Sequence, residues 1–423
     1  MEKIRVYGGQ RVDGKVQISG AKNAALPLLA ASILSENGLT LKNVPPLSDI
    51  STMMSLLETL GVECSRSSVD DYSMTVDCET SSLNNFTAPY EIVKKMRASI
   101  LVLGPLLTRY GHCSVSLPGG CAIGVRPIDL HLKGLEAMGA QIDLKDGYVH
   151  AGAKSGLRGA EFEFPVSTVT GTENLLMAAV LADGETVLKN AAREPEIVDL
   201  ANCLNKMGAR IEGQGTSEIR IVGVSSLHRA EYSVLVDRIE AGTYAIAAAI
   251  TKGQVDLIGG DFRKLLPTFI EKMEDCALVF EDIPNGLRAK YAGEIRPIDF
   301  QTAPFPNFPT DLQAQTMALL CLSSGRSLID EKIWENRFMH VAELARMGAK
   351  ISISGSRATV EGVDHLIGAP VMATDLRASF SLVLAGLAAQ GETIVDRVYH
   401  LNRGYCCAEK KLARCGVRVD RIK

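Results

Sequence analysis

The segment Lys22–Val44, KNAALPLLAASILSENGLTLKNV, is the stretch of sequence from which the fold is predicted. It reads as an Ala- and Leu-rich helix, then a turn with glycine, then a strand. The helix is apolar on nearly all sides, so it is expected to be buried. The same pattern returns five times along the chain, at residues 94–117, 170–191, 238–259, 309–330 and 374–396.

A second pattern follows each of these segments. It is an amphipathic helix, usually ended by a glycine, that leads into a strand, as in LEAMGAQIDL (Leu135–Leu144). Equivalent positions in the six copies recur 68 to 78 residues apart, at Leu60, Met138, Met207, Asp275, Met347 and Cys415. A fixed period indicates a repeated building block. The chain is therefore predicted to consist of six helix-strand-helix-strand units.

The length of the chain predicts more than one hydrophobic core. Its 423 residues exceed what a single hydrophobic core ordinarily serves. Six units over two domains give three units per domain, with the boundary near residue 236. We predict an α/β protein with one domain at residues 1–21 plus 236–423 and a second at residues 22–235. The first of these contains both chain termini.

Composition excludes several classes of protein. The net charge of −4 and the absence of a Lys/Arg block argue against nucleic-acid binding. MEKIRVYGGQ at the start lacks the apolar core of a secretory signal, and the apolar runs are too short to span a membrane. The ten cysteines include no C-x-x-C, so neither a zinc site nor a disulfide framework is expected. These features predict a cytoplasmic protein without metal or cofactor.

Charged residues stand at the starts of the predicted buried helices. Examples are Lys22, Arg97, Asp311 and Arg377. Helix N-termini are partially positive and carry free N–H groups, so added cations would make an anion site where these ends meet. The alternative is that each charge serves only capping and solvation. Six such ends in register favour the anion site.

Several longer motifs carry a family resemblance. They are GGQRVDGKVQISGAKNAALPLLAAS (8–32), PGGCAIGVRPIDLHL (118–132), AAREPEIVDLA (191–201), FPTDLQAQ (308–315), ENRFMHVAEL (335–344), MATDLRAS (372–379) and YHLNRGY (399–405). In this order they resemble the UDP-N-acetylglucosamine enolpyruvyl transferases. The resemblance implies an inside-out α/β barrel of two domains with three repeats each. It also implies transfer of the enolpyruvyl group of phosphoenolpyruvate to the 3-hydroxyl of UDP-N-acetylglucosamine, with release of phosphate. That reaction is the first committed step of peptidoglycan synthesis, on which cell-wall growth, cell shape and division depend.

The resemblance assigns roles to residues of this chain. Lys22, Arg126 and Arg403 would hold the leaving phosphate, and Arg337 and Arg377 the phosphoenolpyruvate carboxylate, for which the forked guanidinium is suited. Contacts with the sugar nucleotide would come from Asn23, Arg97, Pro127, Ile128, Asp129, Leu130, Thr168, Val169, Asp311 and Ile333. Asp375 is expected to orient its neighbours.

Two residues are expected to move protons, because addition and elimination need a general acid and a general base. Cys121 lies in a glycine-rich stretch of about residues 117–127 that we expect to act as a lid, and nearby Arg126 should favour its thiolate. The resemblance allows Cys121 to act as proton donor or through a covalent adduct with phosphoenolpyruvate, and implies alkylation by fosfomycin. Asp311 is the expected base, although PTDLQ also permits a helix N-cap.

Two other functions stay open at this point. A sister class with the same barrel acts on shikimate 3-phosphate, but it lacks the cysteine that stands here at Cys121. A catalytically inactive paralogue that senses UDP-N-acetylglucosamine would be expected to lose Cys121, Lys22, Arg126 or Asp311, and all four are present. The sequence leaves the oligomeric state undetermined.

Overall fold

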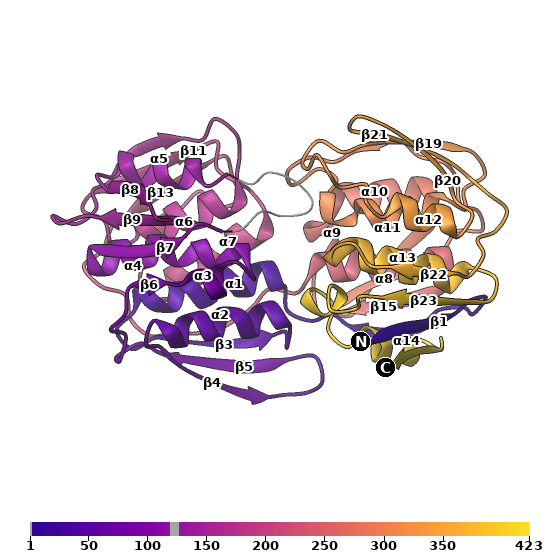
Figure 1. Ribbon diagram of the computed structural model, residues 1–423, viewed down its shortest axis with the longest axis horizontal. Coiled ribbons are helices and arrows are strands. Elements are labelled where there is room, and N and C mark those ends of the chain that lie inside the picture. The colour runs from indigo at the N-terminus through magenta and orange to yellow at the C-terminus, as the bar shows by residue number, and fades with distance from the viewer. Residues whose placement is uncertain (1, 119–126) are drawn as a thin grey trace. The chain divides into compact units, whose positions relative to one another are not determined.

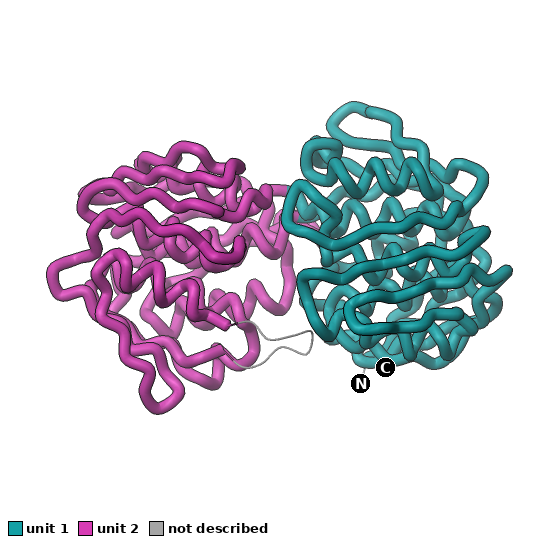
Figure 2. Tube along the Cα trace, turned by 90° about the horizontal axis from the view of Figure 1, so that it is seen from above, with its two compact units in different colours: residues 1–19, 121–125, 236–423 teal, residues 20–120, 126–235 magenta. Residues whose placement is uncertain are grey.

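A computed structural model describes residues 2–118 and 127–423. The expectations for Cys121 and Arg126 lie outside these residues. The chain forms two compact units (Figure 2). Residues 2–19 and 236–423 make up unit 1, and residues 20–118 and 127–235 make up unit 2. Each unit has three helices enclosed in its interior and three four-stranded sheets (Figure 1).

In unit 2, the enclosed helices are α1 (Lys22–Ala31), α4 (Leu103–Tyr110) and α6 (Val169–Ala179). A 3-10 turn at Arg97–Val102 leads into α4. The outer helices are α2 (Ser48–Thr59), α3 (Tyr90–Val93), α5 (Asp129–Ala137) and α7 (Pro195–Lys206). The first sheet has the strand order β14 (Glu231–Ser233), β3 (Leu39–Val44), β5 (Met74–Glu79), β4 (Glu63–Ser68). The second has the order β6 (Thr87–Ala88), β7 (His112–Ser116), β9 (Tyr148–Gly152), β8 (Gln141–Lys145). The third has the order β10 (Glu161–Glu163), β11 (Glu185–Lys189), β13 (Glu218–Val222), β12 (Arg210–Glu212).

Unit 1 is built in the same way around α8 (Arg238–Ile250), α11 (Gln313–Leu320) and α13 (Leu376–Ala388). Short 3-10 turns lie at Thr310–Leu312 and Leu401–Arg403. The outer helices are α9 (Phe262–Leu265), α10 (Pro267–Cys276), α12 (Val341–Arg346) and α14 (Ala408–Arg414). The first sheet has the strand order β16 (Leu278–Ile283), β17 (Gly286–Tyr291), β15 (Gln254–Ile258), β2 (Asp13–Gln17). The second has the order β18 (Phe300–Gln301), β19 (Arg326–Asp330), β21 (Arg357–Glu361), β20 (Lys350–Ser354). The third has the order β22 (Pro370–Met372), β23 (Glu392–Asp396), β1 (Lys3–Tyr7), β24 (Val419–Ile422).

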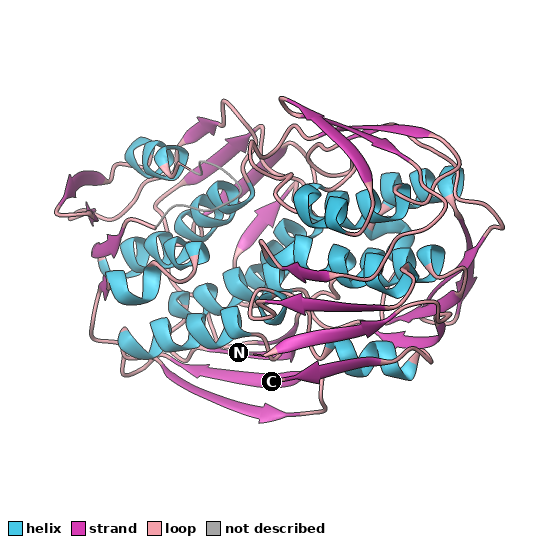
Figure 3. Ribbon diagram, turned by 45° about the vertical axis from the view of Figure 1, so that its right-hand side comes forward, coloured by secondary structure: helices cyan, strands magenta, loops and turns pink. Residues whose placement is uncertain are grey.

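The helices lie inside because their sequences offer no polar face. Every residue of α8 is buried, and α1 leaves only Asn23 exposed. In Figure 3 the strands of the unit with both termini run along its outside, while its helices fill the interior. Burying apolar side chains is the main source of stability, so these Ala-rich helices belong at the centre.

Glycine ends five of the outer helices, as the pattern predicted. Gly61, Gly139, Gly208, Gly348 and Gly416 all have φ between +81° and +104°, a region that side chains with a Cβ rarely enter. The fourth copy has Ala277 instead, with φ −153°. That copy therefore leaves its helix without the left-handed residue.

Two features of the repeat were missed. Five of the outer helices, α2, α5, α7, α10 and α12, are each followed by two antiparallel strands, whereas the pattern predicted one. The β8–β9 turn carries Asp146 and Gly147 at φ +53° and +78°, which is the Asp-Gly signal of a tight hairpin. In addition, β2 pairs with β15 and β14 pairs with β3, both in parallel. These parallel strands come from residues 13–17 and 231–233, close to the points where the chain passes from one unit to the other.

The two ends of the chain share one sheet. β1 pairs antiparallel with β23 on one side and with β24 on the other. The N-terminal strand therefore completes unit 1. Across residues 2–118 and 127–423, no helix combines the length and apolar character needed to cross a membrane.

Candidate active site

In unit 1, Asp311 joins two arginines. Its Oδ1 accepts a hydrogen bond from Nη2 of Arg337 at 2.9 Å, and its Oδ2 accepts one from Nε of Arg377 at 3.1 Å. Asp311 lies in the 3-10 turn before α11, and Arg377 lies in the first turn of α13. The starts of two enclosed helices are thus held together by charge-assisted hydrogen bonds.

The two guanidinium groups are enclosed, whereas the carboxylate is reachable. The side chains of Arg337 and Arg377 are 4% and 3% exposed, and that of Asp311 is 25% exposed. Burial by itself lowers the pKa of Arg377, but Asp311, Tyr405 and Asp237 together outweigh it, and the net pKa is raised. Nη1 of Arg377 is buried without a hydrogen-bond partner among the described residues. It is a donor that a bound carboxylate could satisfy.

Carboxylates cap two of the enclosed helices in unit 1. Asp375 Oδ1 accepts hydrogen bonds from the backbone N–H of Arg377 at 2.8 Å and of Ala378 at 3.0 Å. Asp237 does the same at the start of α8. Burial raises the pKa of Asp237, and the charge of Arg377 opposes that rise. Asp375 therefore fixes the backbone of Arg377, in keeping with the orienting role expected for it.

Asp311 does not cap a helix, so the N-cap reading of PTDLQ was wrong. The residue at the N-cap position is Pro309, and no side chain caps this turn. The carboxylate is engaged by the arginines instead. Neighbouring Thr310 donates its hydroxyl hydrogen bond to Glu331 at 2.9 Å.

Glu331 fixes the position of Ile333. Its buried Oε1 accepts hydrogen bonds from the backbone N–H of Ile333 at 2.9 Å and of Trp334 at 3.2 Å. Because Glu331 also bonds Thr310, Ile333 is tied to the turn that carries Asp311. The sequence pattern gave no reason to single out this glutamate.

Tyr405 links the enclosed helices near Arg403. Its hydroxyl lies 2.9 Å from Nε2 of Gln315 on α11 and 3.1 Å from the hydroxyl of Thr243 on α8. The guanidinium of Arg377 lies 5.5 Å from the centre of the Tyr405 ring. Arg403 itself is half-buried at the end of the 3-10 turn that precedes Tyr405. The buried tyrosine thus positions the segment on which Arg403 stands.

In unit 2, Lys22 begins α1 and pairs with Asp49 of α2. The Lys22 Nζ lies 3.1 Å from Asp49 Oδ2, and both residues are buried. The adjacent Asn23 is exposed. A buried cation needs such a partner to offset its loss of hydration. Asp49 was not among the residues singled out from the sequence.

A second group in unit 2 centres on Arg97 and His131. Nη2 of Arg97 donates to the carbonyl oxygen of Pro127 at 3.2 Å. His131 on α5 lies 3.0 Å from Nδ2 of Asn174 and 3.2 Å from the hydroxyl of Thr170, both on α6. Burial, and then the charge of Arg97, lower the pKa of His131 to about 3. A neutral imidazole therefore joins the segment 127–130 to the start of α6.

The start of α6 is itself capped. Thr168 Oγ1 accepts a hydrogen bond from the backbone N–H of Gly171 at 3.4 Å, and Val169 is the first residue of the helix. Ile128 is buried, whereas Pro127 and Asp129 are exposed and Leu130 is half-buried. The structure brings the two predicted sugar-nucleotide segments together through His131, which the sequence had not singled out.

The predicted residues thus fall into two groups. Unit 1 carries Asp311, Ile333, Arg337, Asp375, Arg377 and Arg403, and unit 2 carries Lys22, Asn23, Arg97, Pro127, Ile128, Asp129, Leu130, Thr168 and Val169. Both groups combine cations with helix starts, which suits anionic ligands. Within the described residues, no three His, Cys, Asp or Glu side chains gather as metal ligands would.

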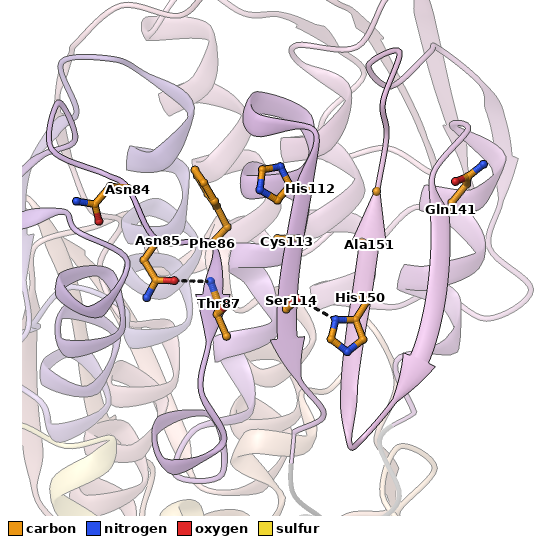
Figure 4. A pocket seen from close by; sticks show the side chains of 11 residues that line it. Asn84, Asn85, Phe86, Thr87, His112, Cys113, Ser114, Gln141, His150 and Ala151 are labelled. Atoms are coloured by element: carbon orange, nitrogen blue, oxygen red, sulfur yellow. Dashed lines mark hydrogen bonds between the residues drawn. The ribbon is translucent and has the colours of Figure 1, made fainter.

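A cavity on the outside of unit 2 contains none of these residues. It is lined by β6, β7, β9 and the segment before β6, among them Phe86, His112 and Cys113 (Figure 4). Ser114 and His150 face each other there, with the hydroxyl oxygen 2.9 Å from Nδ1. None of the residues that line this cavity belongs to the candidate site, so the two are separate.

Comparison with known proteins identifies the family. The model for EPSP synthase (3-phosphoshikimate 1-carboxyvinyltransferase) matches residues 6–412. The UDP-N-acetylglucosamine 1-carboxyvinyltransferase of Dinoroseobacter shibae is 58% identical over all of this chain and all of its own length. The enzyme of that name from Paramagnetospirillum magneticum is 54% identical over all of this chain and 99% of its own.

Solved structures show the same fold. The enolpyruvyl transferase NikO from Streptomyces tendae superimposes with a TM-score of 0.88 at 22% identity, over 99% of this chain and 98% of its own. EPSP synthase from Acinetobacter baumannii gives 0.76 at 17% identity over both full chains. The predicted two-domain barrel of six repeats is confirmed, as is the prediction of an enolpyruvyl transferase. The chain belongs to the EPSP synthase family and, within it, to the UDP-N-acetylglucosamine 1-carboxyvinyltransferases.

Proposed function

We propose that this protein transfers the enolpyruvyl group of phosphoenolpyruvate to the 3-hydroxyl of UDP-N-acetylglucosamine and releases phosphate. The observation that carries the proposal is Asp311, a partly exposed carboxylate held between two enclosed arginines. The full-length identity to relatives named for this sugar nucleotide supports the choice of acceptor. The product would enter peptidoglycan synthesis in the cytoplasm and so serve cell-wall growth and division.

The first step is an addition. Asp311 takes the proton of the sugar 3-hydroxyl group. The hydroxyl oxygen attacks C2 of phosphoenolpyruvate, and C3 receives a proton. Arg337 and Arg377 hold the substrate carboxylate, for which Nη1 of Arg377, without a partner among the described residues, is a donor. Cys121 supplies the proton to C3 or acts through a covalent adduct, and the choice between these roles stays open.

The second step is an elimination. A proton leaves the methyl group at C3 and phosphate departs from C2, which restores the double bond. Lys22, Arg126 and Arg403 receive the growing charge on the phosphate. Fixed cations in an enclosed site stabilise such charge more than water does, because they need no reorganisation.

Residues 1–21 plus 236–423 would form the catalytic domain. Residues 22–235 would form the second domain, with the Cys121 segment as a lid, and binding of the sugar nucleotide would close the two domains over the substrates. Small-angle scattering tests the closure. We expect a smaller radius of gyration with UDP-N-acetylglucosamine, and an unchanged radius would argue against it.

Phosphate release from phosphoenolpyruvate tests the reaction. It should be measured with UDP-N-acetylglucosamine, with shikimate 3-phosphate and with neither. We expect phosphate release only in the sample that contains UDP-N-acetylglucosamine. The Cys121→Ala variant should release no phosphate. Release with shikimate 3-phosphate would move the protein to the sister class. Tight binding of the sugar nucleotide without any release would favour the sensor.

A further inference from the structure

Two cysteines that are not part of the candidate site face each other across a hairpin. β4 and β5 pair antiparallel, and Cys64 lies directly opposite Cys78. Their sulfur atoms are 3.9 Å apart. Directly opposite residues have Cα atoms about 4.5 to 5.5 Å apart, within the range of about 4.4 to 6.8 Å that disulfides span. Rotation of the side chains alone can therefore bring the two sulfur atoms into bonding distance.

Three other thiols in the described residues are engaged differently. Cys276 donates to the carbonyl oxygen of Arg296 at 3.2 Å, and Cys321 to that of Met317, also at 3.2 Å. Cys113 points to the carbonyl oxygen of Leu103 at 3.7 Å. These three thiols use backbone acceptors, whereas Cys64 and Cys78 use each other.

The two cysteines differ in access. β4 is an edge strand, next to β5 in the order β14-β3-β5-β4, and Figure 1 shows the β4–β5 hairpin at the margin of its unit. Cys64 is half-buried, and the other five residues of β4 are exposed. Cys78 is fully buried on β5, between β3 and β4. A small oxidant can therefore reach Cys64 first, and Cys78 is placed to attack it from the inner side.

We propose that Cys64 and Cys78 are a redox modification site, at which a small hydroperoxide forms a reversible disulfide. The sulfur of Cys64 attacks one oxygen of hydrogen peroxide; the O–O bond breaks, water leaves, and a sulfenic acid remains. The thiol of Cys78 gives up its proton and attacks that sulfur, and a second water leaves. Two thiols lose two electrons in total, and one peroxide becomes two waters. A dithiol reductant reverses the change.

The disulfide would anchor the edge strand. β4 has no fully buried side chain of its own, so backbone pairing with β5 holds it in place. The hydrogen bond to Cys78, and then burial, raise the pKa of Cys64. Its thiolate is therefore scarce at neutral pH, and the reaction should run faster as the pH rises. The site would respond to sustained peroxide and not to brief exposure.

Peptide mapping of the full-length protein tests the site. The protein is treated with hydrogen peroxide, quenched, alkylated and digested for mass spectrometry. We expect a peptide pair joined through Cys64 and Cys78 that disappears on reduction with dithiothreitol. Cys64→Ser should abolish the pair, whereas the matched variant Cys113→Ser, also in unit 2, should retain it.

Three results would overturn the proposal. One is separate alkylation of Cys64 and Cys78 under conditions that oxidise other thiols of the chain. Another is their oxidation to sulfinic acids without a linked peptide. The third is a link from either one to a different cysteine. These results come from the wild-type chain, so a poorly folding variant would not obscure them.

Hydrogen exchange supplies a second readout. In the oxidised protein, backbone amides of β4 should exchange about tenfold more slowly than in the reduced protein, because opening of the edge strand becomes restricted. Amides of β20, the corresponding edge strand of a sheet in unit 1, should not change. Equal rates for β4 in both states would show that the disulfide, where formed, anchors nothing.

Discussion

Arg377 is enclosed at the start of α13, and its Nε lies 3.1 Å from Oδ2 of Asp311, which stands in the turn before α11. This contact joins Arg377, which is expected to bind the substrate carboxylate, to Asp311, which is expected to act as the base. The same carboxylate bonds Arg337 at 2.9 Å. Arginines therefore orient both oxygens of Asp311.

Asp311→Asn should lower kcat for phosphate release by at least about 100-fold, since the amide keeps the shape but cannot accept the proton. The matched control is Asp330→Asn, because Asp330 also pairs with an arginine of unit 1, Arg357, at 2.7 Å. We expect its kcat to stay within about twofold of wild type, as for a surface ion pair. Steady-state phosphate release measures both. A kcat for Asp311→Asn close to that of the control would remove Asp311 from the role of base.

Asp375→Ala should lower the free energy of unfolding by about 1 kcal/mol, because α13 loses its cap. Asp375→Asn should retain most of that stability, since the amide oxygen accepts the same two N–H bonds. Urea unfolding followed by circular dichroism compares the two variants. An equal loss in both would mean that the charge of Asp375, and not its capping bond, provides the stability.

His131 should make the protein sensitive to acid. The folded protein keeps this ring neutral down to a pKa of about 3, whereas the unfolded chain protonates it near a pKa of 6.5. As the pH falls from 6.5 towards 3, protons bind the unfolded chain preferentially and stability is lost. Below the unfolded pKa, His131 lowers the free energy of unfolding by up to about 1.4 kcal/mol for each unit that the pH falls. Above the unfolded pKa, His131 has no such effect.

His131→Gln removes this titration and leaves a side chain that can hydrogen-bond Asn174. Urea unfolding across pH 4 to 7 should give a free energy of unfolding that falls less steeply with acid in the variant. The control is His228→Gln, which changes an exposed ring. Parallel curves for wild type and His131→Gln would show that His131 does not titrate differently in the two states.

Cys121→Asp should escape alkylation by fosfomycin, because it lacks the sulfur nucleophile. Intact-mass spectrometry after incubation with the drug and UDP-N-acetylglucosamine should show one added drug molecule on wild type and none on the variant. Cys407→Ser, altered at a half-buried thiol of unit 1, is the control and should still be labelled. Labelling of the Asp variant would place the reactive group elsewhere.

Much of the candidate site was predictable because its residues stand at helix starts within recognisable motifs. Lys22, Arg97, Asp311 and Arg377 could be assigned to the starts of enclosed helices from the apolar pattern alone. The structure places Lys22 and Arg377 in first helical turns, whereas Arg97 and Asp311 lie in the 3-10 turns that lead into α4 and α11. Their partners could not be found in this way. Asp49, Glu331 and Tyr405 come from separate segments, and no local pattern marks a carboxylate that will meet a distant side chain.

The sequence by itself determined the six repeats, the enclosed helices and the glycine ends, because local periodicity and backbone freedom specify these features. Tertiary structure alone decided that β2 joins β15 and β14 joins β3, that Asp311 binds two arginines in place of capping a helix, and that Cys64 meets Cys78. Each of these depends on contacts between residues far apart in the chain or across a hairpin. Such contacts depend on how buried faces pack together and on which strands align. The sequence of a single segment therefore does not predict them.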